Sequence, residues 1–180
     1  MNWKKILIWS NYLKKHYEQV ADKSNFVLVS PIFYKDNEII ESIEKPSISV
    51  FDIMPYRSFI RAALYPHEDY RNYKTTRKFL EDIISLSKIY NVSIYLKNSK
   101  DLDQSKFDRR YINFVKECLT LKNFKLIHTD VSPFQLIEKT NISLSMPWTS
   151  TGCIPSFFNK TGYYYDPLKT IDKNDRGVQN

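Results

Sequence analysis

The sequence predicts an α/β fold, with a mainly parallel sheet of the Rossmann-like type and helices on both faces of the sheet. Short runs of β-branched or aromatic residues, bounded by polar or turn residues, alternate with longer stretches whose apolar residues recur at helical spacing. The short runs are apolar at most positions, as expected for strands that are buried on both faces. Alternation of these two patterns is typical of a parallel sheet whose strands are connected by helices.

Seven segments have the pattern of strands. The first two flank a helical stretch and form a β-α-β prefix, which we expect to pack on the main domain. Pro46 marks the entry to the third strand, so we expect a prefix and linker over 1–44, a Rossmann-like domain over 45–170 and a polar tail over 171–180. The predicted strands are residues 6–10, 26–30, 47–53, 92–96, 124–128, 142–146 and 162–166.

Helices are predicted between these strands. Residues 76–90 and 107–121 each place their apolar side chains on one face at a spacing of about 3.6 residues. A short helix is expected at Pro133, capped by Asp130 or Ser132, because proline is favoured at the first helical position. Another is expected over residues 150–159. The stretch 54–71 lacks a clear periodicity and is predicted as a long functional loop that carries three arginines, Arg57, Arg61 and Arg71.

The composition narrows the class of protein. The chain has 180 residues, 42% of them hydrophobic, which is enough for a substantial core. Two cysteines are too few for a disulfide framework or a zinc site, and we expect no bound metal. No apolar run approaches the roughly 18 residues of a membrane span, and the N-terminus lacks the pattern of a signal peptide. We therefore expect a cytoplasmic protein, either free or peripheral at the inner membrane surface.

The formal net charge of +7 is compatible with a nucleic acid, an anionic membrane surface or a phosphate-rich small ligand as partner. The basic residues are scattered in pairs, however, and no block of five or more occurs. A solvated surface accounts for most of them. A nucleic-acid-binding domain is therefore a less favoured alternative.

The stretch "SMPWTSTG" (145–152) collects hydroxyl side chains between a predicted strand and a predicted helix. In an open α/β sheet, ligands bind beyond the carboxyl ends of the strands. Free N–H groups and the helix dipole favour an anion there, and Thr149, Ser150 and Thr151 add hydroxyl donors. A diphosphate fits this chemistry. The alternative is an ordinary helix cap, which needs only one hydroxyl.

The wider segment "SPFQLIEKTNISLSMPWTSTGCIPSFFNKTGYYYDP" resembles the C-terminal signature of polysaccharide-biosynthesis glycosyltransferases that are named for a Pro-Phe-Thr-Ser motif. Trp148 stands where that motif has Phe, and "NKTG" replaces the usual Gly-Lys-Pro. "ILIWSNYLKK" and "FVLVSPIFY" are similar to an upstream segment of the same family. The resemblance touches most of the chain and is dense over 130–167.

The resemblance implies a GT-B-like architecture and a role in the synthesis of surface glycans. In such enzymes the C-terminal half binds a nucleotide-sugar donor, and the N-terminal half binds the glycan acceptor. The donor is a substrate, so no cofactor is implied, and metal independence is expected. Since a complete GT-B enzyme has two Rossmann-like domains, we expect a missing N-terminal domain or a partner subunit. Catalysis by this chain alone is doubtful, and a non-catalytic relative that keeps the fold is the alternative.

Other side chains near strand ends are candidates for the site. Lys97 follows the strand at 92–96, where the resembling proteins often carry a lysine. It is either a phosphate or ribose contact or a solvated surface lysine, and in both cases we expect it to be largely exposed. Asp52, at the end of its strand, is a cap or a site residue.

The candidates for acid–base chemistry are weaker. His67 and Glu68 belong to a cluster with Asp69 that is either a base or a surface loop, and His128 ends a strand near the expected cleft. Asp166 matches the family signature and is expected to accept a bond from a loop or ligand. The residues predicted to bind the donor are Lys97, Ser132, Thr149, Ser150, Thr151 and Asp166.

Overall fold

A computed structural model describes residues 5–8, 11–19, 25–29, 43–65 and 69–172. The chain divides into two compact units, Met1–Lys35 and Asp36–Asn180. The first unit contains β1 (Ile6–Ile8), α1 (Asn11–Tyr17) and β2 (Phe26–Leu28). β1 and β2 pair in parallel, with Ile6 opposite Phe26. A parallel pair needs a crossover connection, which α1 provides, so the predicted β-α-β order is confirmed.

The second unit is built on a five-stranded sheet. Its neighbouring strands are all parallel, and their order is β5-β4-β3-β6-β7. This confirms the predicted α/β class, and each strand lies within two residues of its predicted bounds. The strands are β3 (Ser47–Phe51), β4 (Ser93–Lys97), β5 (Phe124–Ile127), β6 (Ile142–Ser145) and β7 (Thr161–Tyr164).

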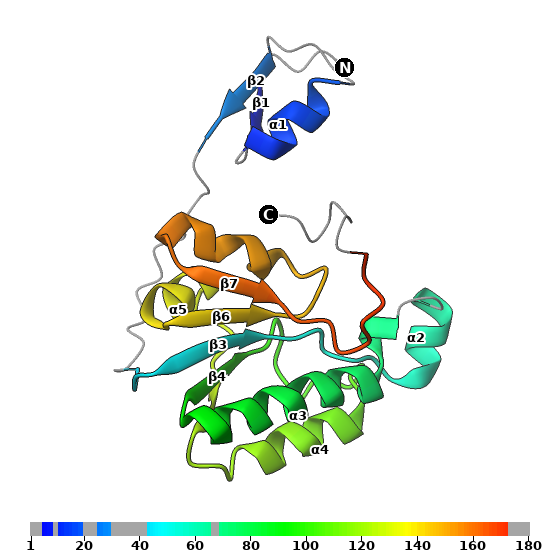
Figure 1. Cartoon of the computed structure of the whole chain (residues 1–180). Helices are drawn as coiled ribbons and strands as arrows, with labels where there is room; N and C mark the ends of the chain where they lie inside the picture. The colour runs from blue at the N-terminus through cyan, green and yellow to red at the C-terminus, as the bar shows by residue number, and fades with distance from the viewer. Residues whose placement is uncertain (1–4, 9–10, 20–24, 30–42, 66–68, 173–180) are drawn as a thin grey trace. The chain divides into compact units, whose positions relative to one another are not determined.

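Helices cover both faces of the sheet (Figure 1). Val50, Ile94 and Leu96 pack in the cluster that includes the buried faces of α3 and α4. Phe51 and Tyr95, which alternate with them, pack on the opposite face against α5 and η3. Because both faces are covered, the strands are apolar at successive positions. The helices are α3 (Tyr73–Tyr90), α4 (Arg109–Cys118), α5 (Pro133–Lys139) and the 3₁₀ helix η3 (Ser150–Phe158).

The helix ends follow the polar signals in the sequence. The side chain of Ser132, one of the two predicted caps, accepts a hydrogen bond from the backbone N–H of Phe134 at 3.3 Å, and Pro133 opens α5. Asn72 caps α3 in the same way, accepting from the N–H of Thr75 at 2.9 Å. These bonds satisfy N–H groups that have no partner within the helix.

The prediction of an irregular loop over 54–71 was wrong. This connection contains the helix α2 (Ser58–Leu64) and the 3₁₀ turn η2 (Asp69–Arg71). α2 buries none of its residues. A helix that packs no face against a core has no reason to show an apolar stripe, so the periodic signal is missing from its sequence.

Candidate functional site

The site lies where the connections of the sheet diverge. The central strand β3 has β4 on one side and β6 on the other. The chain leaves β3 towards α3 and β4, whereas it leaves β6 towards η3 and β7 at the other edge. The carboxyl ends of β3 and β6 therefore flank a topological switch point, the place where open α/β sheets bind ligands.

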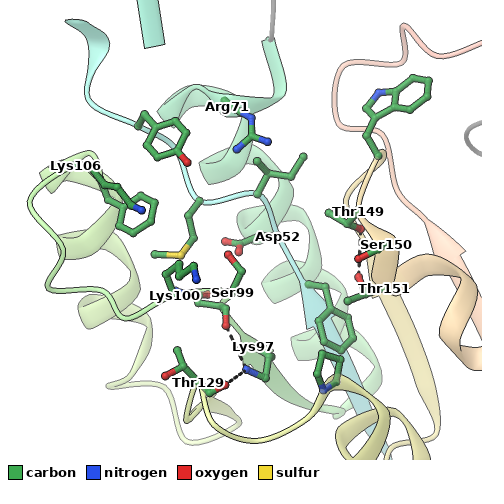
Figure 2. Close-up of a pocket in the computed structure, with 18 residues that line it drawn as sticks. Asp52, Arg71, Lys97, Ser99, Lys100, Lys106, Thr129, Thr149, Ser150 and Thr151 are labelled. Atoms are coloured by element: carbon green, nitrogen blue, oxygen red, sulfur yellow. Dashed lines mark hydrogen bonds between the residues drawn. The ribbon is translucent and has the colours of Figure 1, made fainter. Parts of the chain in front are cut away.

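A cavity of about 540 Å³ opens at these strand ends, within the range of roughly 300–1,000 Å³ that is typical of small-molecule sites. The segments that follow four of the strands contribute to its lining, through Asp52, Asn98, Thr129 and Thr149. Figure 2 shows Asp52 between the turn that follows β6 and the segment that follows β4. The other lining residues are Phe51, Ile53, Met54, Tyr56, Arg71, Lys97, Ser99, Lys100, Lys106, Phe107, Pro133, Trp148, Ser150 and Thr151.

The three predicted hydroxyl residues line this cavity together. The Thr149 hydroxyl donates to the carbonyl of Met146 at 2.7 Å, and the Thr151 hydroxyl lies 3.0 Å from that of Ser145. Thr149 occupies the N-cap position of η3 without a side-chain capping bond. Thr149 is therefore not an ordinary helix cap, which was the alternative to a ligand site in the sequence analysis. Ser150 is exposed.

The backbone of this turn is unusual at Trp148. This residue has a φ of 67°, a left-handed conformation that bulky side chains rarely adopt, and its side chain is 49% exposed. Pro147, before it, is buried. Such conformations are unfavourable and cluster at ligand-binding turns. The turn therefore combines a strained backbone with donor groups at the cavity.

Lys97 lines the cavity but is not the exposed residue that we expected. It is only 6% exposed, and its Nζ donates to the carbonyl of Thr129 at 2.8 Å and to that of Asn98 at 3.3 Å (Figure 2). The expectation of exposure fails because β5 and its following loop cover the end of β4. Lys97 thus holds two strand ends together and brings an ammonium group to the cavity wall.

The charged groups of the cavity lining are mostly basic. The described lining residues include four cationic side chains, Arg71, Lys97, Lys100 and Lys106, and a single carboxyl, that of Asp52. The Arg71 guanidinium also lies 4.6 Å from the centre of the Tyr65 ring, a distance at which a cation–π interaction orients it. Clefts lined by one sign of charge concentrate ligands of the opposite sign. The lining therefore favours an anion.

A buried polar cluster forms one wall of the cavity. The Tyr111 hydroxyl donates to Asp52 Oδ2 at 2.5 Å and lies 3.3 Å from Asn98 Oδ1. Burial raises the pKa of Asp52 to about 7, although the hydrogen bond from Tyr111 opposes the shift. Burial and the neighbouring Asp52 also raise the pKa of Tyr111. The sequence left Asp52 open as a cap or a site residue, and the structure places it in the cavity lining.

Two residues that were predicted to bind the donor lie outside the cavity lining. Ser132 caps α5. Asp166 accepts from the Tyr70 hydroxyl at 2.9 Å and from the backbone N–H groups of Leu168 and Thr170 at 2.8 and 2.7 Å. Desolvation raises its pKa, but these bonds and one from Ile171 hold the pKa below its usual range. Asp166 thus accepts bonds from a loop, one of the two alternatives expected.

His128 lies on a smaller neighbouring pocket and not in the main cavity lining. Its Nδ1 accepts from the backbone N–H of Asp130 at 3.3 Å, and both side chains are exposed. His67 and Glu68 fall outside the described residues. Within the described ranges, no cluster of three His, Cys, Asp or Glu side chains is arranged to hold a metal ion. None of the helices described is both long and apolar enough to cross a bilayer.

The sequence reasoning missed several lining residues. Asn98, Ser99 and Lys100 directly follow the strand that ends at Lys97, so the signal that selected Lys97 also applies to them. Thr129 follows β5 in the same way. Tyr111 does not line the cavity but holds Asp52 there. It could not be found by this signal, because it lies on the buried face of α4 and has the pattern of a core residue.

Comparison with known proteins places the chain in a family. Residues 1–180 match the family described as "Polysaccharide biosynthesis PFTS motif protein". No curated protein matches. Among solved structures, the chain is similar to a mutant of S. aureus TarM in complex with Fondaparinux, alpha-GlcNAc-glycerol and UDP. The identity is 10% and the TM-score 0.43, over 95% of this chain and 32% of that one. The match along its whole length shows that this chain belongs to the family of PFTS-motif proteins of polysaccharide biosynthesis.

Proposed function

We propose that the second unit binds the diphosphate of a nucleotide-sugar donor at the carboxyl ends of β3, β4 and β6, as part of a glycosyltransferase of surface polysaccharide biosynthesis. The observation that carries the proposal is the meeting of the hydroxyl-rich turn and the cationic side chains in one cavity at the switch point. Membership of the polysaccharide biosynthesis family supports a glycan-building reaction.

The proposed chemistry depends on the charge of the leaving group. When the sugar is transferred, the bond between its anomeric carbon and the diphosphate oxygen breaks, and negative charge develops on that oxygen. The hydroxyl groups of Thr149, Ser150 and Thr151 and the ammonium groups of Lys97 and Lys100 line the cavity. Thr129 fixes the Lys97 ammonium, and the Thr149 proton is already donated to a backbone carbonyl, so that hydroxyl would support the turn and not donate to the ligand. Fixed donors aimed at developing charge stabilise it without reorganisation during the reaction.

We propose that protein side chains supply the positive charge that balances the diphosphate. The four cationic lining side chains are suited to neutralise a diphosphate. We therefore expect donor binding to persist in EDTA. The glycan acceptor would be bound by a further domain or a partner subunit, so this chain would bind the donor and complete the reaction only with that second part.

A thermal-shift screen tests the proposal. The protein is heated with UDP-glucose, UDP-N-acetylglucosamine, GDP-mannose and CMP-N-acetylneuraminate, with and without EDTA. A ligand that binds only the folded state, at a concentration of about 100 times its Kd, stabilises the folded protein by roughly 2.7 kcal/mol. The Tm of the protein must therefore rise. An unchanged Tm with every donor at millimolar concentration contradicts the proposal.

Two further measurements, of sugar transfer and of oligonucleotide binding, distinguish the alternatives. A non-catalytic relative that keeps the site would bind a donor and never transfer its sugar, even with the second part present. A nucleic-acid-binding domain would instead be stabilised by an oligonucleotide, and this effect would fall steeply with salt.

A further inference from the structure

Two buried polar atoms beside the cavity have no hydrogen-bond partner within the described part of the chain. They are Oδ1 of Asp52, an acceptor, and Nδ2 of Asn98, a donor. Asp52 is 7% exposed and Asn98 2% exposed, and both residues line the cavity. An unsatisfied buried polar atom is unfavourable, and in native proteins such atoms call for a partner.

The two residues directly follow the neighbouring strands β3 and β4, and one hydroxyl group lies beside both. Tyr111 donates to the other oxygen of Asp52 at 2.5 Å and lies 3.3 Å from the other amide atom of Asn98. The single Tyr111 proton goes to Asp52, the shorter of the two contacts, and the opposite atoms of the two side chains have no partner among the described residues. The carboxyl of Asp52 lies between the walls of the cavity in Figure 2.

The chemistry of the two free atoms selects a type of ligand group. A hydroxyl donates one hydrogen bond and accepts others, so it can donate to Asp52 Oδ1 and accept from Asn98 Nδ2 at once. Above about pH 7, where Asp52 carries its charge, a phosphate oxygen has no proton to donate to the carboxylate and is repelled by it. The basic side chains and the hydroxyl turn therefore suit the diphosphate, whereas the Asp52–Asn98 pair suits a neutral, hydroxylated part of the same molecule.

We infer that Asp52 and Asn98 form a hydroxyl-binding subsite that recognises a sugar ring of the ligand, with Tyr111 as the residue that positions both. This inference rests on the proposed donor site, because it assigns the sugar-binding part of that cavity. The ring is either the ribose of the nucleotide or the hexose that is transferred. Both carry hydroxyls on adjacent carbons, and the experiment separates the two sources.

The experiment measures affinities by calorimetry at pH 8, above the pKa of Asp52, for four probes: inorganic pyrophosphate, UDP, 2′-deoxy-UDP and UDP-glucose, with the corresponding guanosine compounds run in parallel. Pyrophosphate reports the phosphate site alone. Asp52→Asn replaces the free acceptor with a donor, and Asn98→Asp does the reverse. The double change exchanges the two, and a ligand hydroxyl can follow that exchange because it rotates about its C–O bond.

For each single change we expect a loss of at least about tenfold in affinity for the probe that carries the recognised hydroxyl, because a buried group is left unmatched. The affinity of each variant for pyrophosphate should stay within about twofold of the parent value. The double variant should recover most of the loss. If ribose is the ring, UDP is affected and 2′-deoxy-UDP is not; if the hexose is the ring, only UDP-glucose is affected.

Several results overturn the inference. If both single variants bind UDP and UDP-glucose with unchanged affinity, the subsite does not exist. The donor proposal is then still supported, because the parent protein binds these probes. Equal losses for pyrophosphate and the sugar-bearing probes show that the pair supports the phosphate site or the fold. Failure of every probe to bind the parent protein contradicts the donor proposal itself, and the subsite with it.

A second measurement needs no variant and covers the case of misfolding. With aspartate labelled at the side-chain carboxyl carbon, the NMR shift of Asp52 should move when UDP-glucose is added to the parent protein. Pyrophosphate should leave that signal within its line width. The same displacement with both probes, or with neither, contradicts the assignment of Asp52 to a sugar hydroxyl.

Discussion

The ring of Tyr164 occupies the space beside Gly152 in which any other residue would place its Cβ. A Cβ at Gly152 would lie 2.1–2.3 Å from ring and hydroxyl atoms of Tyr164, whose hydroxyl donates to the Thr149 carbonyl at 3.0 Å. Gly152 has no positive φ, so glycine serves close packing here and not backbone conformation. The pair holds the start of η3 against β7 and so supports the hydroxyl-rich turn.

The first prediction concerns this contact. Gly152→Ala should lower the free energy of unfolding by about 1–3 kcal/mol, because overpacking forces neighbouring groups to move. Denaturant unfolding measures the change. In a Tyr164→Ala background the same substitution should have little effect, since the ring that it meets is gone. An equal effect in both backgrounds would show that the clash with Tyr164 is not the cause.

The second prediction compares two lysines at the same cavity. Lys97→Met removes charge-assisted bonds to the carbonyls of Asn98 and Thr129 and should destabilise the fold by about 1.5–3 kcal/mol. Lys100 is exposed, so Lys100→Met should change stability by less than about 0.5 kcal/mol. Chemical unfolding of both variants tests this contrast.

Binding gives a separate readout for the lysines. If Lys97 contacts a donor phosphate, its substitution should also weaken nucleotide-sugar binding by about 1–3 kcal/mol, as for other charge-assisted bonds. Full affinity in a folded Lys97→Met protein would assign this lysine a structural role only.

The third prediction concerns the hydroxyl-rich turn, formed by Thr149, Ser150 and Thr151. Ser150→Ala combined with Thr151→Ala should abolish the Tm increase produced by nucleotide sugars and leave a folded domain. Thr151 bonds to Thr149 and Ser145, so a stability loss of about 1 kcal/mol is expected for each bond removed. Ser156→Ala, on η3 but not among the lining residues, is the matched control and should retain the ligand effect. A normal Tm increase in the double variant removes the turn from the site.

The fourth prediction follows from the burial of Asp52. Its pKa is raised from 3.8 to about 7, so between these pH values the folded protein binds this proton more tightly than the unfolded chain. The contribution to stability is complete below about pH 4 and is lost as the pH rises through about 7. At about 1.4 kcal/mol for each pH unit, the loss is on the order of 4 kcal/mol.

Asp52→Asn isolates this effect, because an amide does not titrate. The stability of the variant relative to the parent should increase between pH 4 and pH 8, as measured by urea unfolding at several pH values. A difference between the two proteins that is independent of pH would show that Asp52 titrates near its ordinary pKa in the folded state.

Local sequence determined the elements of this fold. The five strands of the second unit, both long helices and the hydroxyl turn lie within a few residues of their predicted positions. The reason is that a strand buried on both faces and a helix with one buried face each impose a period on neighbouring residues. Where an element buries no face, as in α2, its sequence shows no such period and the prediction fails. Turn residues at a strand end are also local, so Thr149, Ser150 and Thr151 could be placed at the ligand-binding edge.

Contacts between distant residues were decided only by the tertiary structure. The carboxyl of Asp52 meets a hydroxyl 59 positions away, on Tyr111, and no periodicity encodes such a meeting. Lys97 is buried because the loop after β5, at Thr129, covers it. The strand order that forms the switch point also depends on which strands pair. These properties arise from the packing of whole elements, whereas a sequence pattern reports only the environment of each element by itself.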